Sequence, residues 1–158
     1  MKVSKYLTYE EATKSPTAKR LGIENKPTKD HLENMRRVAI NVFDKVREHF
    51  SVPIGVSSFY RSQELNDAVP GSSKTSQHRT GEAIDIDADI YGNVTNLDIF
   101  NYIKDNLVFD QLIAEYVDKD GMPSWVHVSL VPKKNRRQVL VKLKEKYILY
   151  KDYKVGMT

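Results

Sequence analysis

The chain has no cysteine and no long apolar run, and both absences limit what it can be. Without cysteine, its 158 residues can form neither a disulfide nor a thiolate metal site, and they suit either redox compartment. No apolar stretch approaches the ~20 residues of a membrane span, so no membrane association is expected. No apolar segment follows residues 1–6 as a secretory signal would require, which predicts synthesis in the cytoplasm without a signal peptide.

Acidic residues are scarce near the C-terminus. Residues 132–158 hold nine Lys or Arg and two acidic residues, a net charge of +7, while the whole chain carries +4 and the remainder therefore −3. This basic C-terminal segment, counted from residue 133, favours a polyanionic partner, either nucleic acid or the anionic polymers of a cell wall, or it is a solvated charged face. No aromatic-rich nucleic-acid motif accompanies it, so nucleic acid is not the expected partner.

Hydrophobic periodicity predicts one α+β domain over residues 1–158. The composition, 40% hydrophobic and 29% charged, is that of an ordinary globular chain of single-domain length. The clearest helix is expected over residues 28–49, where apolar residues recur every three or four positions behind a Thr28 cap. Shorter helices are expected over 63–69 and 95–106, and the first twenty residues are interpreted as an arm with short helical turns.

Alternating apolar and polar residues predict a small antiparallel sheet with helices packed on one face. The expected strands span residues 52–58, 83–87, 111–117 and 124–130. Asp120-Gly121 lies between the last two runs and indicates a hairpin turn. Beyond residue 133 the pattern is weaker and favours two further strands, near 139–143 and 147–150.

Two residues between Ser76 and Asp89 are good ligands for a divalent metal ion. His78 is placed on a loop and Asp85 on the wet face of the strand that follows. His127 lies on the outward face of another alternating run, so two strands of one sheet can present Asp85 and His127 together. Two imidazoles and one carboxylate form a ligand set of hydrolytic zinc sites, which keep one position open for water.

The remaining histidines, His31 and His49, lie near the two ends of the long helix and outside any ligand motif. They are interpreted as surface or packing residues. Asp87 shares a strand face with Asp85 and is a candidate for orienting a ligand histidine.

The order and spacing of these residues resemble a known family. The pattern His78-x-x-Gly81-x-Ala83-x-Asp85, preceded by Ser76 and followed about forty residues later by Trp125-x-His127, is similar to the zinc D-alanyl-D-alanine peptidases of the phage type. Their superfamily includes lysostaphin-type peptidases and the hedgehog signalling domain. Further similar segments are Ser-Phe-Tyr-Arg-Ser at 58–62, where the family usually has Gly in place of Phe59, Asn-Lys-Pro-Thr at 25–28 and Phe-Asp-Gln-Leu-Ile at 109–113.

The resemblance covers roughly residues 6–140 and keeps the family's order of motifs, which is far more specific than any one motif alone. It implies a hedgehog/D-Ala-D-Ala peptidase-like fold. It also implies one zinc ion, held by His78, Asp85 and His127 on the open face of the sheet.

The general base departs from the family's pattern, because many relatives carry an acid three residues before the last histidine, and Ser124 stands at that position. Glu115 is the replacement that we predict, since a hairpin turning at Asp120-Gly121 brings it across from the region of His127. The alternative is a surface glutamate paired with a lysine.

Four residues are candidates for binding substrate. Arg61 matches the family's arginine, and its guanidinium can hold a carboxylate through two parallel hydrogen bonds, unless it forms a structural salt bridge. Ser76 resembles a serine that hydrogen-bonds substrate beside the zinc, and serves equally well as a loop cap. Tyr60 and Trp125 are predicted as pocket walls, with a core position as the alternative for Trp125.

The function that the resemblance implies is hydrolysis of peptidoglycan stem peptides by a zinc metallopeptidase, either a D-Ala-D-Ala carboxypeptidase or an endolysin-type endopeptidase. Lack of an export signal fits a phage-encoded enzyme that reaches the cell wall by other means. The alternative is a non-catalytic, zinc-containing module for cell-wall binding or recognition, which Ser124 favours.

Overall fold

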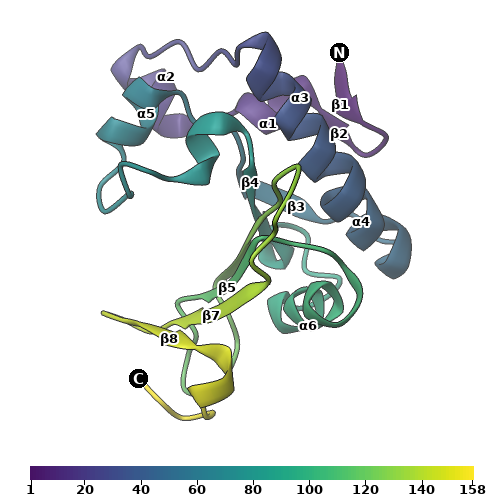
Figure 1. Cartoon of the computed structure of the whole chain (residues 1–158), viewed down its shortest axis with the longest axis vertical. Coiled ribbons are helices and arrows are strands. Elements are labelled where there is room, and N and C mark those ends of the chain that lie inside the picture. Colours follow the sequence, from purple (N-terminus) through teal and green to yellow (C-terminus); the bar gives the residue numbers. More distant parts are fainter.

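The computed structural model describes residues 1–158, and its centre is a six-stranded mixed sheet (Figure 1). The strands, in the order in which they lie, are β3 (Gly55–Ser58), β4 (Ala83–Asp87), β6 (Trp125–Ser129), β5 (Gln111–Glu115), β7 (Gln138–Lys142) and β8 (Tyr147–Leu149). All neighbours run antiparallel except β5 and β7, which are parallel. The predicted α+β class is confirmed. The sheet was predicted to be antiparallel, and the parallel pairing of β5 with β7 corrects that part of the prediction.

Helices cover one face of this sheet. The long predicted helix is continuous but contains a π-helical turn, η1 (Ala39–Phe43), between α3 (Lys29–Val38) and α4 (Asp44–Phe50). Together with α6 (Asn96–Asn106), it lies on one side of the strands in Figure 1. Side chains from both layers form the core, among them Met35, Phe43, Phe100, Ile84, Leu112 and Val128. None of the helices combines the length and the apolar character that crossing a membrane requires.

The N-terminal arm is more ordered than the sequence predicted. It forms a two-stranded sheet from β1 (Lys2–Ser4) and β2 (Leu7–Thr8), then α1 (Tyr9–Thr13) and α2 (Pro16–Leu21). Asp44 of α4 holds this arm, because its carboxylate accepts hydrogen bonds from the Ser4 hydroxyl and from two backbone N–H groups. The remaining elements are α5 (Gln63–Ala68) and the 3-10 turns η2 (Gln77–Thr80), η3 (Ala88–Ile90) and η4 (Tyr150–Asp152).

The basic C-terminal segment is part of the sheet. β7 pairs with β5 and β8 pairs with β7, and Val141 and Leu143 are buried. Its lysines are mostly exposed, and they include Lys133, Lys134, Lys144, Lys146, Lys151 and Lys154. The segment therefore combines structural strands with a positively charged surface.

Candidate metal centre and cleft

Asp85 and His127 lie directly opposite each other on neighbouring strands of the open face. In the register of β4 with β6, Asp85 pairs with His127, while Ile84 and Ile86 pair with Val128 and Val126. Because side chains alternate along a strand, the isoleucines and valines enter the core and the Asp85–His127 pair faces away from it. The predicted alternation thus places two ligand side chains on rigid strands.

His78 reaches the same place from the 3-10 turn η2. The Ser76 hydroxyl caps this turn by accepting a hydrogen bond from the backbone N–H of His78, at 3.2 Å. Gly81 ends it with a φ of +77°, and a Cβ there would lie 2.6 Å from the backbone oxygen of His31. The turn is therefore pressed against α3, which fixes the direction in which His78 projects.

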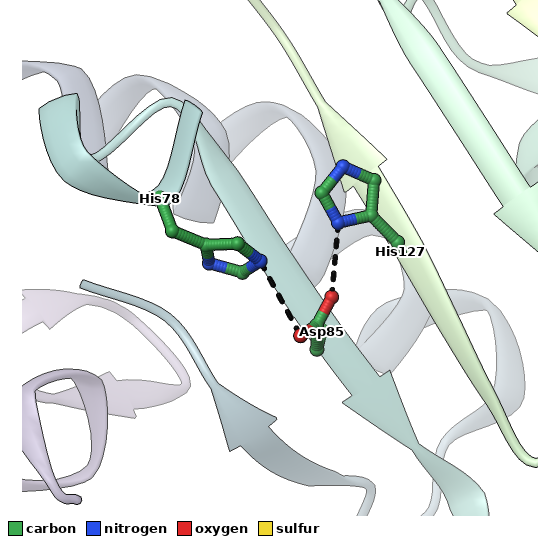
Figure 2. Close-up of side chains that lie close together, drawn as sticks. All are labelled: His78, Asp85 and His127. Carbon is green, nitrogen blue, oxygen red and sulfur yellow. Dashed lines mark hydrogen bonds and ion pairs between the residues drawn. The ribbon is translucent and has the colours of Figure 1, made fainter. Parts of the chain in front are cut away.

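One hydrogen bond selects the nitrogen that His78 presents. Its Nδ1 lies 2.6 Å from the carbonyl oxygen of Phe59, so Nδ1 carries the proton and donates it. Nε2 is then unprotonated and directed at Asp85, with an Nε2–Oδ2 distance of 3.3 Å (Figure 2). That approach lacks hydrogen-bond geometry, so Nε2 is a buried acceptor without a partner.

The three side chains converge on one point. His127 Nδ1 lies 3.0 Å from Asp85 Oδ1, and ligand atoms of His78, Asp85 and His127 all lie within 4.8 Å of one another. Figure 2 shows the carboxylate between the two imidazoles. A partnerless buried nitrogen, a second imidazole and a carboxylate fit a single zinc ion, because this donor set is one that zinc prefers.

Electrostatics keep these groups in the protonation states that metal binding requires. Burial lowers the pKa of His78, which favours the neutral imidazole. Burial alone would raise the pKa of Asp85, but the two histidines beside it, with the hydrogen bond from His127, hold that pKa well below its ordinary value. A neutral imidazole and an ionised carboxylate are both competent ligands.

Glu115 is a buried carboxyl group on the same face. It is 8% exposed, lies at the end of β5 opposite Trp125 in the register, and lines the cleft that contains the three converging residues. Burial raises the pKa of Glu115 to about 7, a value suited to a group that takes and returns a proton near neutral pH. Glu115 forms no ion pair with a lysine. Ser124, at the position where many relatives carry an acid, donates a hydrogen bond from its hydroxyl to the backbone carbonyl of Tyr116.

The open face forms the floor of a cleft of about 1220 Å³. Arg61, Ser76 and Trp125 all line this cleft. Arg61 Nε is buried without a hydrogen-bond partner, and no carboxylate pairs with the guanidinium, so a structural salt bridge does not occupy it. Burial lowers the pKa of Arg61, and the charge of Asp85 acts in the opposite direction.

Tyr60 lies elsewhere than the sequence suggested. It is 3% exposed, belongs to the core and is absent from the lining of the cleft. Its hydroxyl forms a 3.0 Å hydrogen bond with His31 Nδ1, so the phenol is held between β3 and α3 and forms no pocket wall. His31 is thus a packing residue, as predicted, and so is His49, which stacks on Tyr102.

Asp87 does not orient a histidine. Its carboxylate accepts hydrogen bonds from the backbone N–H of Asp89 and from Asn96 Nδ2. The backbone carbonyl of Phe59 orients the His78 ring instead, by accepting a hydrogen bond from Nδ1. A backbone acceptor leaves no signal in the sequence, which is why side-chain reasoning missed it.

Two polar hubs around the cleft were also missed. Asn25 accepts a hydrogen bond from Ser62 N–H and donates to the carbonyls of Thr13 and Tyr60, which fixes the segment that carries Arg61. Asp110 accepts hydrogen bonds from Arg136 and Gln77, so it links η2 to the C-terminal segment. The hydrogen bond from Arg136 is the main cause that lowers the pKa of Asp110 to about 2.

Comparison with known proteins identifies the family. A search of curated proteins finds no match. The family model described as peptidase M15 matches residues 5–129, a span that contains His78, Asp85, Glu115 and His127. This family consists of zinc metallopeptidases, and the match covers well over half of the chain. With a His-Asp-His group converging in an open cleft, the chain belongs to the peptidase M15 family.

Proposed function

We propose that the chain is a zinc metallopeptidase that hydrolyses amide bonds in peptidoglycan stem peptides. The observation that carries this proposal is the convergence of His78, Asp85 and His127 beside Glu115 in one cleft. Family membership supports peptide hydrolysis, and the resemblance to D-Ala-D-Ala peptidases supports the peptidoglycan substrate. The expected setting is a phage-encoded lytic enzyme that acts on the cell wall.

Each group has a distinct part in this reaction. A zinc ion held by the three ligands would polarise the scissile carbonyl and make water nucleophilic near neutral pH. Glu115 accepts the proton of the attacking water on its carboxylate and passes it to the leaving amine. The buried guanidinium of Arg61 binds a carboxylate of the substrate, and Trp125 provides an apolar wall.

Two variants test the assignment. Asp85→Ala removes one of three ligands, so zinc affinity measured by calorimetry is expected to fall more than about 100-fold, with activity lost in parallel. Glu115→Gln keeps all ligands, so it should bind one zinc ion normally while kcat falls about 10²–10⁴-fold. Asp89→Ala, an exposed acid four residues beyond Asp85, is the matched control and should change neither quantity.

The assay is digestion of purified cell wall and of defined muropeptides, with the products weighed by mass spectrometry. Full activity of Glu115→Gln would move the general base to another residue. Zinc binding without cleavage of any substrate would favour the rival function, a non-catalytic cell-wall recognition module. The exposed lysines of the C-terminal segment would hold either protein to anionic wall polymers.

A further inference from the structure

The row of residues that begins at the metal ligands continues across the whole sheet. In the strand registers, Asp85 pairs with His127, His127 with Ile113, Ile113 with Leu140, and Leu140 with Leu149. All five side chains therefore project on the open face, and all five line the cleft. An apolar floor of Ile113, Leu140 and Leu149 runs straight from the metal centre to the edge strand.

This floor is long enough for several residues of a substrate. Neighbouring strands lie about 4.8 Å apart, so three spacings from His127 to Leu149 cover about 14 Å. An extended peptide rises about 3.3 Å per residue, and four residues would fill that length. The cleft volume of about 1220 Å³ also exceeds the ~300–1,000 Å³ of pockets that hold one small molecule.

Polar groups flank the apolar floor. On one side, Gln111 Nε2 donates a 2.8 Å hydrogen bond to Gln138 Oε1, which leaves an acceptor on Gln111 and a donor on Gln138. One free acceptor and one free donor complement a peptide unit. On the other side, Lys142 Nζ lies 4.2 Å from the ring centroid of Tyr147. The apolar floor therefore lies between polar groups that can hydrogen-bond a peptide backbone.

The cleft also extends past the metal centre in the opposite direction. Arg61 and Ser58 lie on the β3 side of β4, and beyond them the lining continues to Lys14–Thr17 and to the loop Val69–Ser73. Figure 1 shows α2 and α5 at one end of this side of the molecule and β8 at the other. The metal ligands thus lie within a continuous cleft, with room for substrate residues on both sides.

Two of the three strands that build the floor, β7 and β8, lie outside the family match. The match ends at residue 129, whereas Gln138, Leu140, Tyr147 and Leu149 come from β7 and β8. We propose that the β7–β8 hairpin is a subsite for an extended peptide, and that the chain therefore cleaves an internal bond of a cross-linked or elongated stem peptide instead of releasing one terminal residue. This inference rests on the proposed function and narrows its substrate.

The test uses calorimetry to compare binding of a short and a long probe to zinc-loaded Glu115→Gln protein, in which neither probe should be hydrolysed appreciably during the titration. The short probe is the free stem pentapeptide ending in D-Ala-D-Ala, in its lysine and diaminopimelate forms. The long probe is the cross-linked muropeptide dimer with the same stems. We expect the dimer to bind about tenfold more tightly, because burial of one leucine side chain supplies that factor.

Leu149→Asp places a charge on the floor at an exposed edge position. This variant should abolish the tighter binding of the dimer and leave the affinity for the pentapeptide unchanged. Leu140→Ala should reduce the difference in affinity between the two probes without adding a charge. Val108→Asp is the matched control, since Val108 is exposed and lies outside the cleft. Circular dichroism checks that each variant is folded.

The outcomes separate this inference from the peptidase proposal. The subsite is overturned if Leu149→Asp leaves the difference in affinity between dimer and pentapeptide unchanged. It is also overturned if the protein that retains Leu149 binds both probes equally. Release of single alanine residues as the only product overturns internal cleavage. Tight dimer binding that depends on Leu149 but gives no hydrolysis keeps the subsite and removes the peptidase function instead.

Discussion

At the scale of single residues, the site depends on how burial changes the chemistry of ionisable groups. Glu115 and Asp85 line one cleft, yet their pKa values move in opposite directions. Asp85 has two histidines beside it, and they keep its carboxylate ionised. The Glu115 side chain forms no hydrogen bond or ion pair, so burial outweighs the charge of His127 and raises the pKa of Glu115 to about 7. One carboxylate is thereby suited to bind a cation and the other to exchange protons.

This raised pKa makes a testable contribution to stability. Between about pH 4.5 and 7 the folded, metal-free protein holds a proton on Glu115 that the unfolded chain has released, so its free energy of unfolding falls as pH rises. A shift of this size corresponds to a loss on the order of 3 kcal/mol. The Glu115→Gln side chain is neutral at every pH, so this variant should not show that fall in the free energy of unfolding.

The measurement is urea unfolding of both proteins at pH 5 and pH 8 in the presence of a chelator. The other titrating groups are common to both, so the difference between the two pH dependences isolates Glu115. Identical dependences would mean that the carboxyl group titrates normally and is more exposed to water than its position on β5 indicates.

At the scale of elements, the turn η2 is the piece on which the metal centre depends most. It carries His78, and it is held by its Ser76 cap, by Gln77 bonded to Asp110 and by the contact of Gly81 with α3. His78 is therefore positioned by contacts with two distant parts of the chain. Displacing η2 from α3 should move His78 away from Asp85.

Gly81→Ala should produce that displacement. The new Cβ would lie 2.6 Å from the His31 oxygen and 2.7 Å from Met35 Cγ. We expect a loss of about 2–4 kcal/mol of stability and weaker zinc binding, measured by thermal unfolding and calorimetry. Gly92→Ala is the matched control, because Gly92 has a φ of +78° with no atom within 4 Å of the new Cβ.

Comparing the two variants separates backbone strain from the steric contact. Both pay the cost of a left-handed alanine, about 1–2 kcal/mol, but only Gly81→Ala overlaps α3. Equal destabilisation, with zinc affinity kept in both, would show that η2 adjusts freely and that its contact with the helix does not position His78.

Local periodicity predicted elements well, and it failed where an element's behaviour depends on distant groups. Alternation around Asp85 and His127 identified both strands and their outward faces. The pattern from Leu32 to Val46 is uninterrupted, so it could not reveal the π-helical turn at Ala39–Phe43. Tyr60 was misplaced because it packs in the core and its hydroxyl is hydrogen-bonded to His31, which is 29 residues away in the chain.

At the scale of the whole molecule, the C-terminal strands complete the sheet. Alternation suggested strands after residue 133 but could not tell where they would pair, because the partner of a strand is chosen by the rest of the fold. β7 lies parallel to β5 and covers its edge, with Val141 and Leu143 in the core. The basic C-terminal segment is thus part of the structural unit.

A chain that ends at residue 131 should therefore fail to fold into a stable protein, although it contains the whole family match. β5 would become an exposed edge, and two buried side chains would be lost. We expect no cooperative thermal transition by circular dichroism and aggregation at micromolar concentration.

The control removes only residues 154–158, which are exposed, and should melt close to the full chain. A soluble, cooperatively folded chain ending at residue 131 would instead mark β7 and β8 as a dispensable addition. It would also provide a shortened protein in which the contribution of β7 and β8 to catalysis can be measured.

The order of the strands has a consequence for when the protein becomes able to act. Translation delivers the three metal ligands by residue 127, but the floor beyond Ile113 comes from residues 138–149. Without β7 the edge of β5 is open and the sheet that positions these ligands is incomplete, so the ligands alone do not make a site. Ion binding and peptide binding should therefore appear together during biosynthesis, once the strands within residues 138–149 have paired.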